Sequence, residues 1–128
     1  MRLRPSSLAC IALASGLVAA PAFGTDGPIT TLGGYAGDGG PANVARLNQP
    51  EGSAVAADGS VLIADSRNHV IRRVAPNGII TTVAGSGGAG LAGDGGQATL
   101  AQLDTPTDVA FAADGSYYIA DEFNDRIR

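Results

Sequence analysis

His69 is the only histidine among the 128 residues, and it limits the nucleophilic chemistry that the chain could carry. A Ser-His-Asp arrangement would have to be built around this one imidazole, and no G-x-S-x-G elbow accompanies it. Asp65 with Arg72, and Asp121 with Arg128, are carboxylate–guanidinium pairs that also resemble catalytic pairs. An active site is usually built once, whereas a contact that stabilises a repeated unit recurs, so we interpret both pairs as structural.

Two kinds of glycine-rich segment could hold a phosphate or a metal ion. Residues 85–90 (GSGGAG) satisfy the dinucleotide pattern G-x-G-x-x-G, but glycines continue through residue 96 and leave no room for a helix to open within the motif. Each GDGG segment offers a single carboxylate, Asp38 or Asp94, and one carboxylate binds a hard cation weakly. We interpret the first segment as a flexible loop and the GDGG segments as turns whose aspartate caps a short helix, and we expect no cofactor and no metal ion.

The charge balance argues against nucleic acid as a partner. All eight basic residues are arginines, against twelve acidic residues, and the formal net charge is −4. Such a surface repels phosphate, and aromatic residues at 5% are too few for base stacking. The apolar content of 45% is nevertheless typical of a folded domain rather than of a disordered chain.

The N-terminus has the pattern of an export signal. Residues 1–7 carry two arginines, residues 8–20 (LACIALASGLVAA) are apolar and uncharged, and the small residues APAFG end the segment. This order is typical of a secretory signal peptide, here residues 1–24 with cleavage after residue 22 or 24. We expect a secreted or periplasmic protein that has no membrane span after signal removal and no thiol, since Cys10 lies within the signal.

A repeat with a spacing of 56 residues organises the remainder, residues 25–128. Residues 37–72 align with residues 93–128 without a gap, and 20 of the 36 aligned pairs are identical. Upstream, the ITT of residues 29–31 matches the ITT of residues 80–82 at a spacing of 51. The second copy therefore has five more residues in its glycine-rich segment, an insertion that a surface loop absorbs at little entropic cost.

Each repeat has the pattern of four short antiparallel strands. In the first copy the strands are expected at residues 53–57, 61–64, 69–75 and 79–84. Asp58-Gly59 is a hairpin signal, and Asn77-Gly78 favours a type I′ turn in which both residues take positive φ. Asp65 and its neighbours suit the turn between the second and third strands.

Two further patterns suggest how these strands pack. Residues 41–47 (PANVARL) predict one or two helical turns with Val44 and Leu47 as the apolar face. The second strands, VLIA at 61–64 and YYIA at 117–120, are continuous apolar runs of the kind that is buried on both faces. An antiparallel four-stranded sheet buried on both faces indicates an all-β fold of stacked sheets, as in the blades of a β-propeller.

Residues 50–72 (PEGSAVAADGSVLIADSRNHVIR) and 106–128 (PTDVAFAADGSYYIADEFNDRIR) resemble the NHL-repeat β-propeller family. The D-x-x-N-x-x-I-R ending of that family supplies a structural signature at six positions, which are Asp65, Asn68, Arg72, Asp121, Asn124 and Arg128. The I-T-T-x-x-G and G-D-G-G-x-A elements resemble the secreted bacterial branch. The usual Gly-Val before the inner strand is absent, since the chain has Gly52-Ser53 and Asp108-Val109 there.

The resemblance implies an incomplete propeller of about two blades, because propellers have about 4–8. Its parts would be the last strand of one blade at 29–32, a full blade at 52–84, a partial blade at 107–128, and connections at 33–51 and 85–106. We expect the N-terminal fragment of a longer exported protein whose further blades cover the outer faces, which would otherwise expose Tyr117, Ile119, Val61 and Ile63. A short chain that assembles a ring from several copies is the alternative.

The expected function is that of a binding or interaction scaffold that takes a protein or a small ligand. The alternative is the N-terminal part of a propeller enzyme, lyase or lactonase-like hydrolase, with its catalytic residues beyond residue 128. Antiparallel strands bring the turn after the second strand and the long connections to one end of each blade, whereas the other end has minimal hairpins. Long, variable loops on a rigid sheet usually carry binding, so the candidate residues are Tyr35, Arg67, His69, Glu122 and Phe123.

Overall fold

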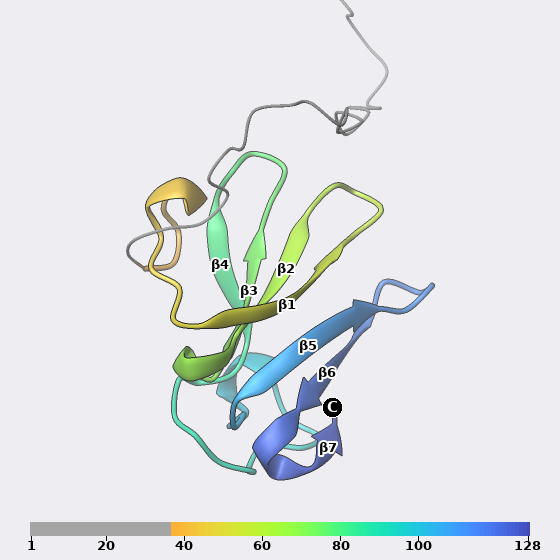
Figure 1. The fold of residues 1–128 in the computed structure, drawn as a ribbon. Coiled ribbons are helices and arrows are strands. Elements are labelled where there is room, and N and C mark those ends of the chain that lie inside the picture. The colour runs from red at the N-terminus through yellow and green to blue at the C-terminus, as the bar shows by residue number, and fades with distance from the viewer. Residues whose placement is uncertain (1–36) are drawn as a thin grey trace, which may run out of the picture.

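The computed structural model describes residues 37–128. The expected signal peptide, the strand at 29–32 and Tyr35 lie outside the described residues. The described part contains two antiparallel sheets connected by loops with short 3₁₀ turns, and no α-helix occurs within it (Figure 1). The prediction of an all-β fold is confirmed.

The first sheet is a four-stranded meander that matches the expected strands to within a few residues. Its strands, in the spatial order of the sequence, are β1 (Pro50–Val55), β2 (Val61–Asp65), β3 (Val70–Val74) and β4 (Ile80–Ala84). The second sheet is formed by β5 (Pro106–Phe111), β6 (Tyr117–Asp121) and β7 (Arg126–Ile127). The first two strands of each sheet pair in the same register. Pro50 pairs with Asp65 in the first sheet, and the equivalent Pro106 pairs with Asp121 in the second.

Both hairpin loops of the first sheet contain three residues, whereas a type I′ turn has two. The N–H of Gly59 donates to the carbonyl of Ala56, and the N–H of Gly78 donates to the carbonyl of Ala75. Gly59 and Gly78 have φ of 83° and 81°, whereas Asn77 is not among the residues with positive φ. These are three-residue loops that end on a left-handed glycine, so the type I′ prediction for Asn77 is wrong.

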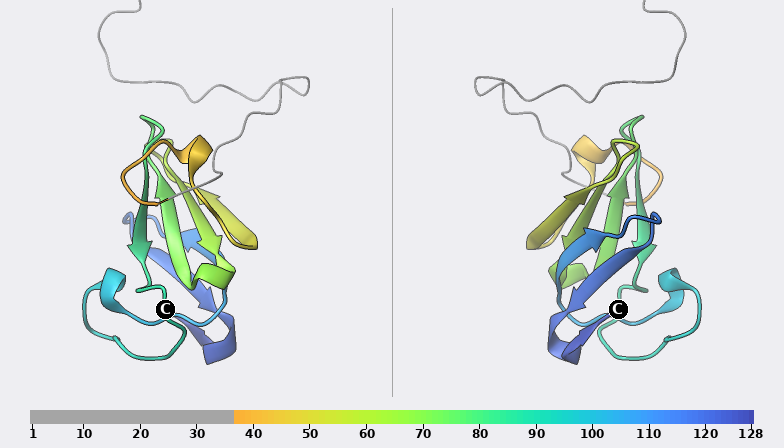
Figure 2. Two further views of the ribbon diagram at one scale, coloured as in Figure 1. Left: turned by 90° about the vertical axis from the view of Figure 1, so that its left-hand side faces the viewer. Right: turned by 90° about the vertical axis from the view of Figure 1, so that its right-hand side faces the viewer.

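The two sheets pack face to face, and β1 lies beside β5 (Figures 1 and 2). Their shared core contains apolar residues of both sheets and Leu103 of the connection that enters β5. It comprises Leu62, Ala64, Ile71, Ala84, Leu103, Val109 and Ile119. Tyr117 and Ile119 thus face the first sheet rather than the outside, which corrects the expectation that they are exposed. The exposed apolar residues of the second sheet are instead Tyr118 and Ile127.

The first connection covers a second group of apolar residues on the first sheet. It contains the 3₁₀ turn η1 (Ala42–Val44), which packs Ala42 and Ala45 against Val74 and Ile80, with Leu47, Val61 and Ile63 half-buried around them. Val61 and Ile63 are therefore covered rather than exposed. Val44 is half exposed, because a 3₁₀ turn has three residues per turn and aligns Ala42 with Ala45 instead.

The same connection also reaches the end of the blade that holds the short hairpins. The N–H of Ala42 donates to the carbonyl of Gly78 in the turn between β3 and β4, and Gly39 and Gly40 bond to Ile80. The expectation that the long connection lies wholly at the opposite end is wrong, because its first part pairs along β4. Asp38 does not cap η1, whose N-cap is Pro41 without a side-chain bond.

A cleft at the corners of the two repeats

Each sheet turns from its second to its third strand through one 3₁₀ turn, which is η2 (Ser66–Asn68) in the first sheet and η4 (Glu122–Asn124) in the second. Asp65 precedes η2, and its carboxylate is fully buried. Oδ1 accepts the backbone N–H of Asn48 at 2.6 Å, and Oδ2 accepts Nδ2 of Asn68 at 2.8 Å. Nη1 of Arg72 lies 3.6 Å from Oδ2. The carboxylate therefore joins the turn to the connection that enters β1.

The second repeat reproduces this arrangement. Asp121 is fully buried, accepts the N–H of Asp104 at 2.7 Å and Nδ2 of Asn124 at 2.8 Å, and lies 3.2 Å from Nη1 of Arg128. The arginines also bind the GDGG segments, since Arg72 lies 2.8 Å from Asp38 and Arg128 lies 2.6 Å from Asp94. The aspartate and arginine of each repeat signature are thus engaged in internal contacts that fix the corner and the preceding connection.

Four residues other than glycine take left-handed backbone near these corners. They are two pairs at equivalent positions of the repeats, Gln49 with Thr105 and His69 with Asp125, all with φ of 53–54°. This conformation is a genuine outlier for a β-branched residue such as Thr105. It is held in place by backbone bonds, because the N–H of Arg67 donates to Asn48 and the N–H of Phe123 donates to Asp104.

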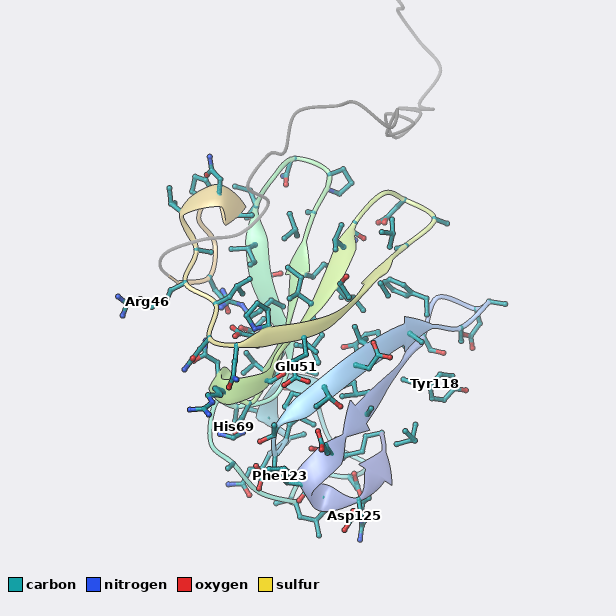
Figure 3. All side chains as sticks on the ribbon, viewed as in Figure 1. Arg46, Glu51, His69, Tyr118, Phe123 and Asp125 are labelled. Atoms are coloured by element: carbon teal, nitrogen blue, oxygen red, sulfur yellow. The ribbon has the colours of Figure 1, made fainter. Side chains whose placement is uncertain are left out.

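The two corners lie next to each other and enclose a cleft of about 720 Å³. Its lining comes from both turns and from the segments that enter β1 and β5, and comprises Asn48, Gln49, Glu51, Arg67, His69, Asp104, Thr105, Glu122 and Phe123. Figure 3 shows Glu51, His69 and Phe123 at this end of the sheets. Four of the five candidate residues thus line one cleft, and the fifth, Tyr35, lies outside the described residues.

His69 connects the two repeats across the cleft. Its Nδ1 accepts the backbone N–H of Thr105 at 3.1 Å and lies 3.6 Å from Oδ1 of Asp104. In a neutral imidazole this bond places the proton on Nε2, which makes that atom a donor. A second link is buried nearby, because Oγ of Ser66 donates to the carbonyl of Pro106 at 2.7 Å. The two walls of the cleft are therefore fixed relative to each other.

Sequence reasoning missed five lining residues, Asn48, Gln49, Glu51, Asp104 and Thr105. A signal for four of them was present, because Asn48 is equivalent to Asp104 and Gln49 to Thr105 at the spacing of 56 residues. They immediately precede the proline that starts each inner strand. Their part in the site follows only when the two repeats are placed side by side.

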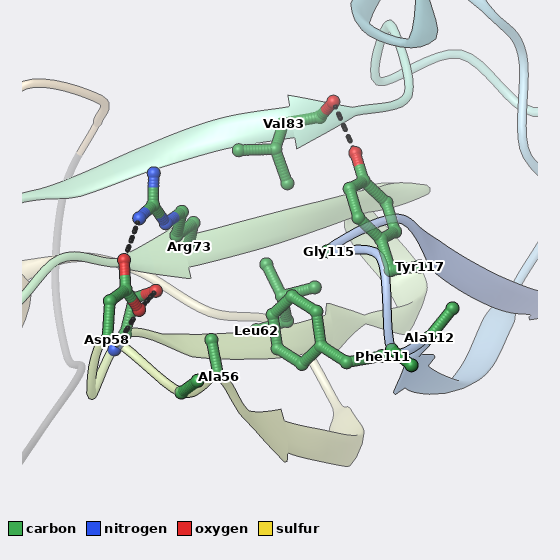
Figure 4. Close-up of a pocket in the computed structure, with 12 residues that line it drawn as sticks. Ala56, Asp58, Leu62, Arg73, Val83, Phe111, Ala112, Gly115 and Tyr117 are labelled. Atoms are coloured by element: carbon green, nitrogen blue, oxygen red, sulfur yellow. Dashed lines mark hydrogen bonds and ion pairs between the residues drawn. The ribbon is translucent and has the colours of Figure 1, made fainter.

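A second groove of about 550 Å³ lies between the sheets at the hairpin end (Figure 4). Phe111 and Tyr117 meet there edge to face with ring centroids 6.4 Å apart, and the Tyr117 hydroxyl donates to the carbonyl of Val83 at 3.0 Å. Burial raises the pKa of Tyr117. Arg73 lines the same groove and binds Asp58 at 2.7 Å. The hairpin end therefore has a groove lined by aromatic and charged side chains, whereas the sequence predicted only minimal hairpins there.

Residues 37–128 show neither a metal-ion cluster nor a membrane-spanning helix. No group of three or more histidine, cysteine, aspartate or glutamate side chains stands where it could hold a metal ion in that part of the chain. Within the same residues no helix is long and apolar enough to cross a membrane.

Comparison of the sequence with known proteins identifies related repeats. The family model of the Teneurin NHL domain matches residues 30–92. Teneurin-1 of Mus musculus is 40% identical over 93 residues, which are 68% of this chain and 3% of that protein. The chloroplastic protein SUPPRESSOR OF QUENCHING 1 of Arabidopsis thaliana is 37% identical over 83 residues, 64% of this chain and 8% of that protein.

Two solved structures with the same fold come from Bacteroides species. An auxiliary nutrient binding protein from Bacteroides ovatus superposes with a TM-score of 0.62 at 26% identity, over 76% of this chain and 26% of that chain. A protein of unknown function from Bacteroides thetaiotaomicron superposes with a TM-score of 0.63 at 28% identity, over 68% of this chain and 22% of that chain. The chain therefore spans about a quarter of these structures and a smaller share of the curated relatives.

Proposed function

Because the chain belongs to the NHL-repeat β-propeller family, we propose that it is part of an exported binding scaffold that holds its ligand in the corner cleft. The observation that carries this proposal is the convergence of four variable residues, Arg67, His69, Glu122 and Phe123, on one cleft. Each of them differs from its counterpart in the other repeat, whereas the buried Asp65 and Asp121 beneath them are identical. A constant framework with variable side chains above it is typical of a binding surface.

The dimensions and rigidity of the cleft also suit a ligand. Its volume falls within the range of about 300–1,000 Å³ that small-molecule sites occupy. The buried carboxylates and the backbone bonds of η2 and η4 hold its walls in place before any ligand arrives. Preorganisation of this kind lowers the entropic cost of binding. Two neighbours from Bacteroides are named auxiliary nutrient binding proteins, which favours a small ligand over a large partner here.

Ligand binding can be tested by thermal unfolding of the chain in a panel of neutral sugars, amino acids, dicarboxylates and nucleosides. A ligand that binds only the folded state raises stability by about 2.7 kcal/mol at 100 times its Kd. We expect at least one compound to raise the Tm, and the variants Arg67→Ala and Phe123→Ala to lose that rise. Ser116→Ala, at the hairpin end, is the matched control and should keep it. An equal loss in all three variants would show that the corner cleft is not the site.

Export rests on the N-terminal pattern of two arginines, an apolar stretch and small residues at 20–24. Expression of the chain in a bacterial host, followed by N-terminal sequencing of the extracytoplasmic fraction, tests it. We expect a mature N-terminus at Phe23 or Thr25. Full-length chain that is retained in the cytoplasm would contradict the assignment.

A further inference from the structure

The cleft carries an unusual mixture of side chains for its size. Its lining includes three carboxylates, one guanidinium, one imidazole, two amides and one phenyl ring, from Glu51, Asp104, Glu122, Arg67, His69, Asn48, Gln49 and Phe123. Carboxylates accept hydrogen bonds, guanidinium and Nε2–H donate, and amides do both. With three carboxylates against one arginine, the lining repels phosphate, sulfate and carboxylate ligands. A predominantly apolar ligand would leave these polar groups without partners.

Phe123 is the one aromatic side chain in this polar surface. Phe123 is 67% exposed. The single pair of contacting aromatic rings within residues 37–128 is formed by two other residues, so the Phe123 ring is not part of it. The turn η4 fixes its backbone, because its N–H donates to the carbonyl of Asp104. A rigidly mounted, exposed ring beside hydrogen-bonding groups offers a flat apolar surface at little conformational cost.

From this combination we propose that the cleft binds a neutral carbohydrate, an inference that rests on the proposed function. A sugar ring presents hydroxyls at its edge, which both donate and accept, and C–H groups on its face. The edge matches the carboxylates, amides and arginine, and the C–H face matches the ring of Phe123. Glu122 precedes Phe123 in η4 and lines the same cleft, and Arg67 lines it from the equivalent turn of the other repeat, so polar groups from both turns are available to a sugar placed on Phe123. A volume of about 720 Å³ accommodates a short oligosaccharide.

The experiment is isothermal titration of the chain with neutral hexasaccharides of glucose, xylose and mannose, alongside oligogalacturonate and a mixture of free amino acids. At least one neutral oligosaccharide is expected to bind, and oligogalacturonate is expected to bind at least tenfold more weakly. Phe123→Ala should weaken binding at least tenfold, Phe123→Trp should retain it, and Glu122→Ala should weaken it at least threefold. Leu100→Ala, which removes an equally exposed apolar side chain outside the cleft, should leave affinity unchanged. Circular dichroism and Tm of each variant establish that it is folded.

The outcomes separate the ligand class from the site. Binding of amino acids, or of oligogalacturonate alone among the sugars, with loss in Phe123→Ala, would overturn the assignment of a neutral carbohydrate and leave the corner cleft as the binding site. Sugar binding that persists in both Phe123→Ala and Glu122→Ala would overturn the cleft as the site, and with it the proposed function. The absence of heat for every neutral oligosaccharide would likewise overturn the carbohydrate assignment.

Discussion

Gly52 shows at the scale of one residue how the two repeats are held together. It lies on β1, where the inner strand of the second repeat passes closely. A Cβ at this position would lie 2.6 Å from Cα of Asp108 and 2.7 Å from the carbonyl oxygen of Thr107. Real Cβ atoms essentially never come so close to backbone, so one of the strands would have to shift. The second repeat has Asp108 at the equivalent position, which means that this close approach is not repeated in the described residues.

Replacement of Gly52 by alanine should therefore separate the two sheets locally. We expect Gly52→Ala to destabilise the fold by about 1–3 kcal/mol, the usual cost of overpacking, as measured by denaturant unfolding. Gly40→Ala is a matched control, because the nearest atom to a Cβ there is 3.9 Å away, and its effect should stay within about 0.5 kcal/mol. A Gly52→Ala variant as stable as Gly40→Ala would show that the strands can move apart freely.

The sequence predicted the cleft residues that lie in turns, but not those that are placed by the packing of the two repeats. Arg67 and Phe123 could be found because they are equivalent, lie in a turn, and differ between the repeats. Gln49 and Thr105 also differ between the repeats, but their left-handed backbone could not be predicted, because it comes from tertiary bonds rather than from residue types that favour it. Glu51 lies on a strand and belongs to the cleft only through the packing of two repeats.

At the scale of elements, the hairpin between β1 and β2 and the hairpin between β5 and β6 have the same acidic turn. Asp58 accepts the hydroxyl and the backbone N–H of Ser60, and Asp114 accepts the same two groups of Ser116. The hydroxyl of Ser60, followed by its N–H, lowers the pKa of Asp58, to which Arg73 also contributes. Ser116 lowers the pKa of Asp114 in the same way.

A lowered pKa in the folded state has a definite consequence for stability at acid pH. The carboxylates stabilise the hairpins above their unfolded pKa of about 3.9, and this contribution is lost as the pH falls through the lower folded pKa. We expect the Asp58→Asn, Asp114→Asn double variant to lose less stability than the unsubstituted chain between pH 5 and pH 2.5, as measured by denaturant midpoints. An identical acid slope in both proteins would show that these two carboxylates do not couple to folding.

Strand positions were predictable from the sequence to within a few residues because the short apolar runs and the turn residues both recur in each repeat. The course of the first connection was not, since residues 37–47 carry no strand pattern and are placed by bonds to β4 and Gly78. Nor could the pattern YYIA show which tyrosine is covered. Tyr117 faces the first sheet and Tyr118 faces away, and the choice depends on the register of β5 with β6.

For the molecule as a whole, the internal repeat allows the exposed face of the second sheet to be compared with the covered face of the first. Leu62 and Ile71 of the first sheet are 1% and 0% exposed, because the second sheet covers them. Their equivalents in the second sheet, Tyr118 and Ile127, are 57% and 70% exposed. The residues that do the covering include Val109 and Ile119. By the same geometry, Tyr118 and Ile127 could pack against another sheet of this repeat type. That sheet would contribute apolar residues at the positions equivalent to Val109 and Ile119.

Without such a blade, this face should make the molecule self-associate. We expect residues 25–128 to sediment as dimers or larger species, because an exposed apolar sheet face is partly buried when two copies meet. The Tyr118→Ser, Ile127→Thr double variant should shift the population toward monomer at equal concentration. Leu100→Ser removes a side chain that is also 70% exposed but stands in the turn η3 (Ala98–Leu100), so it should leave the distribution unchanged. If the unsubstituted chain is a monomer with one sharp thermal transition, the exposed face is stable in water without a partner. If both variants dissociate equally, the contact between copies lies elsewhere.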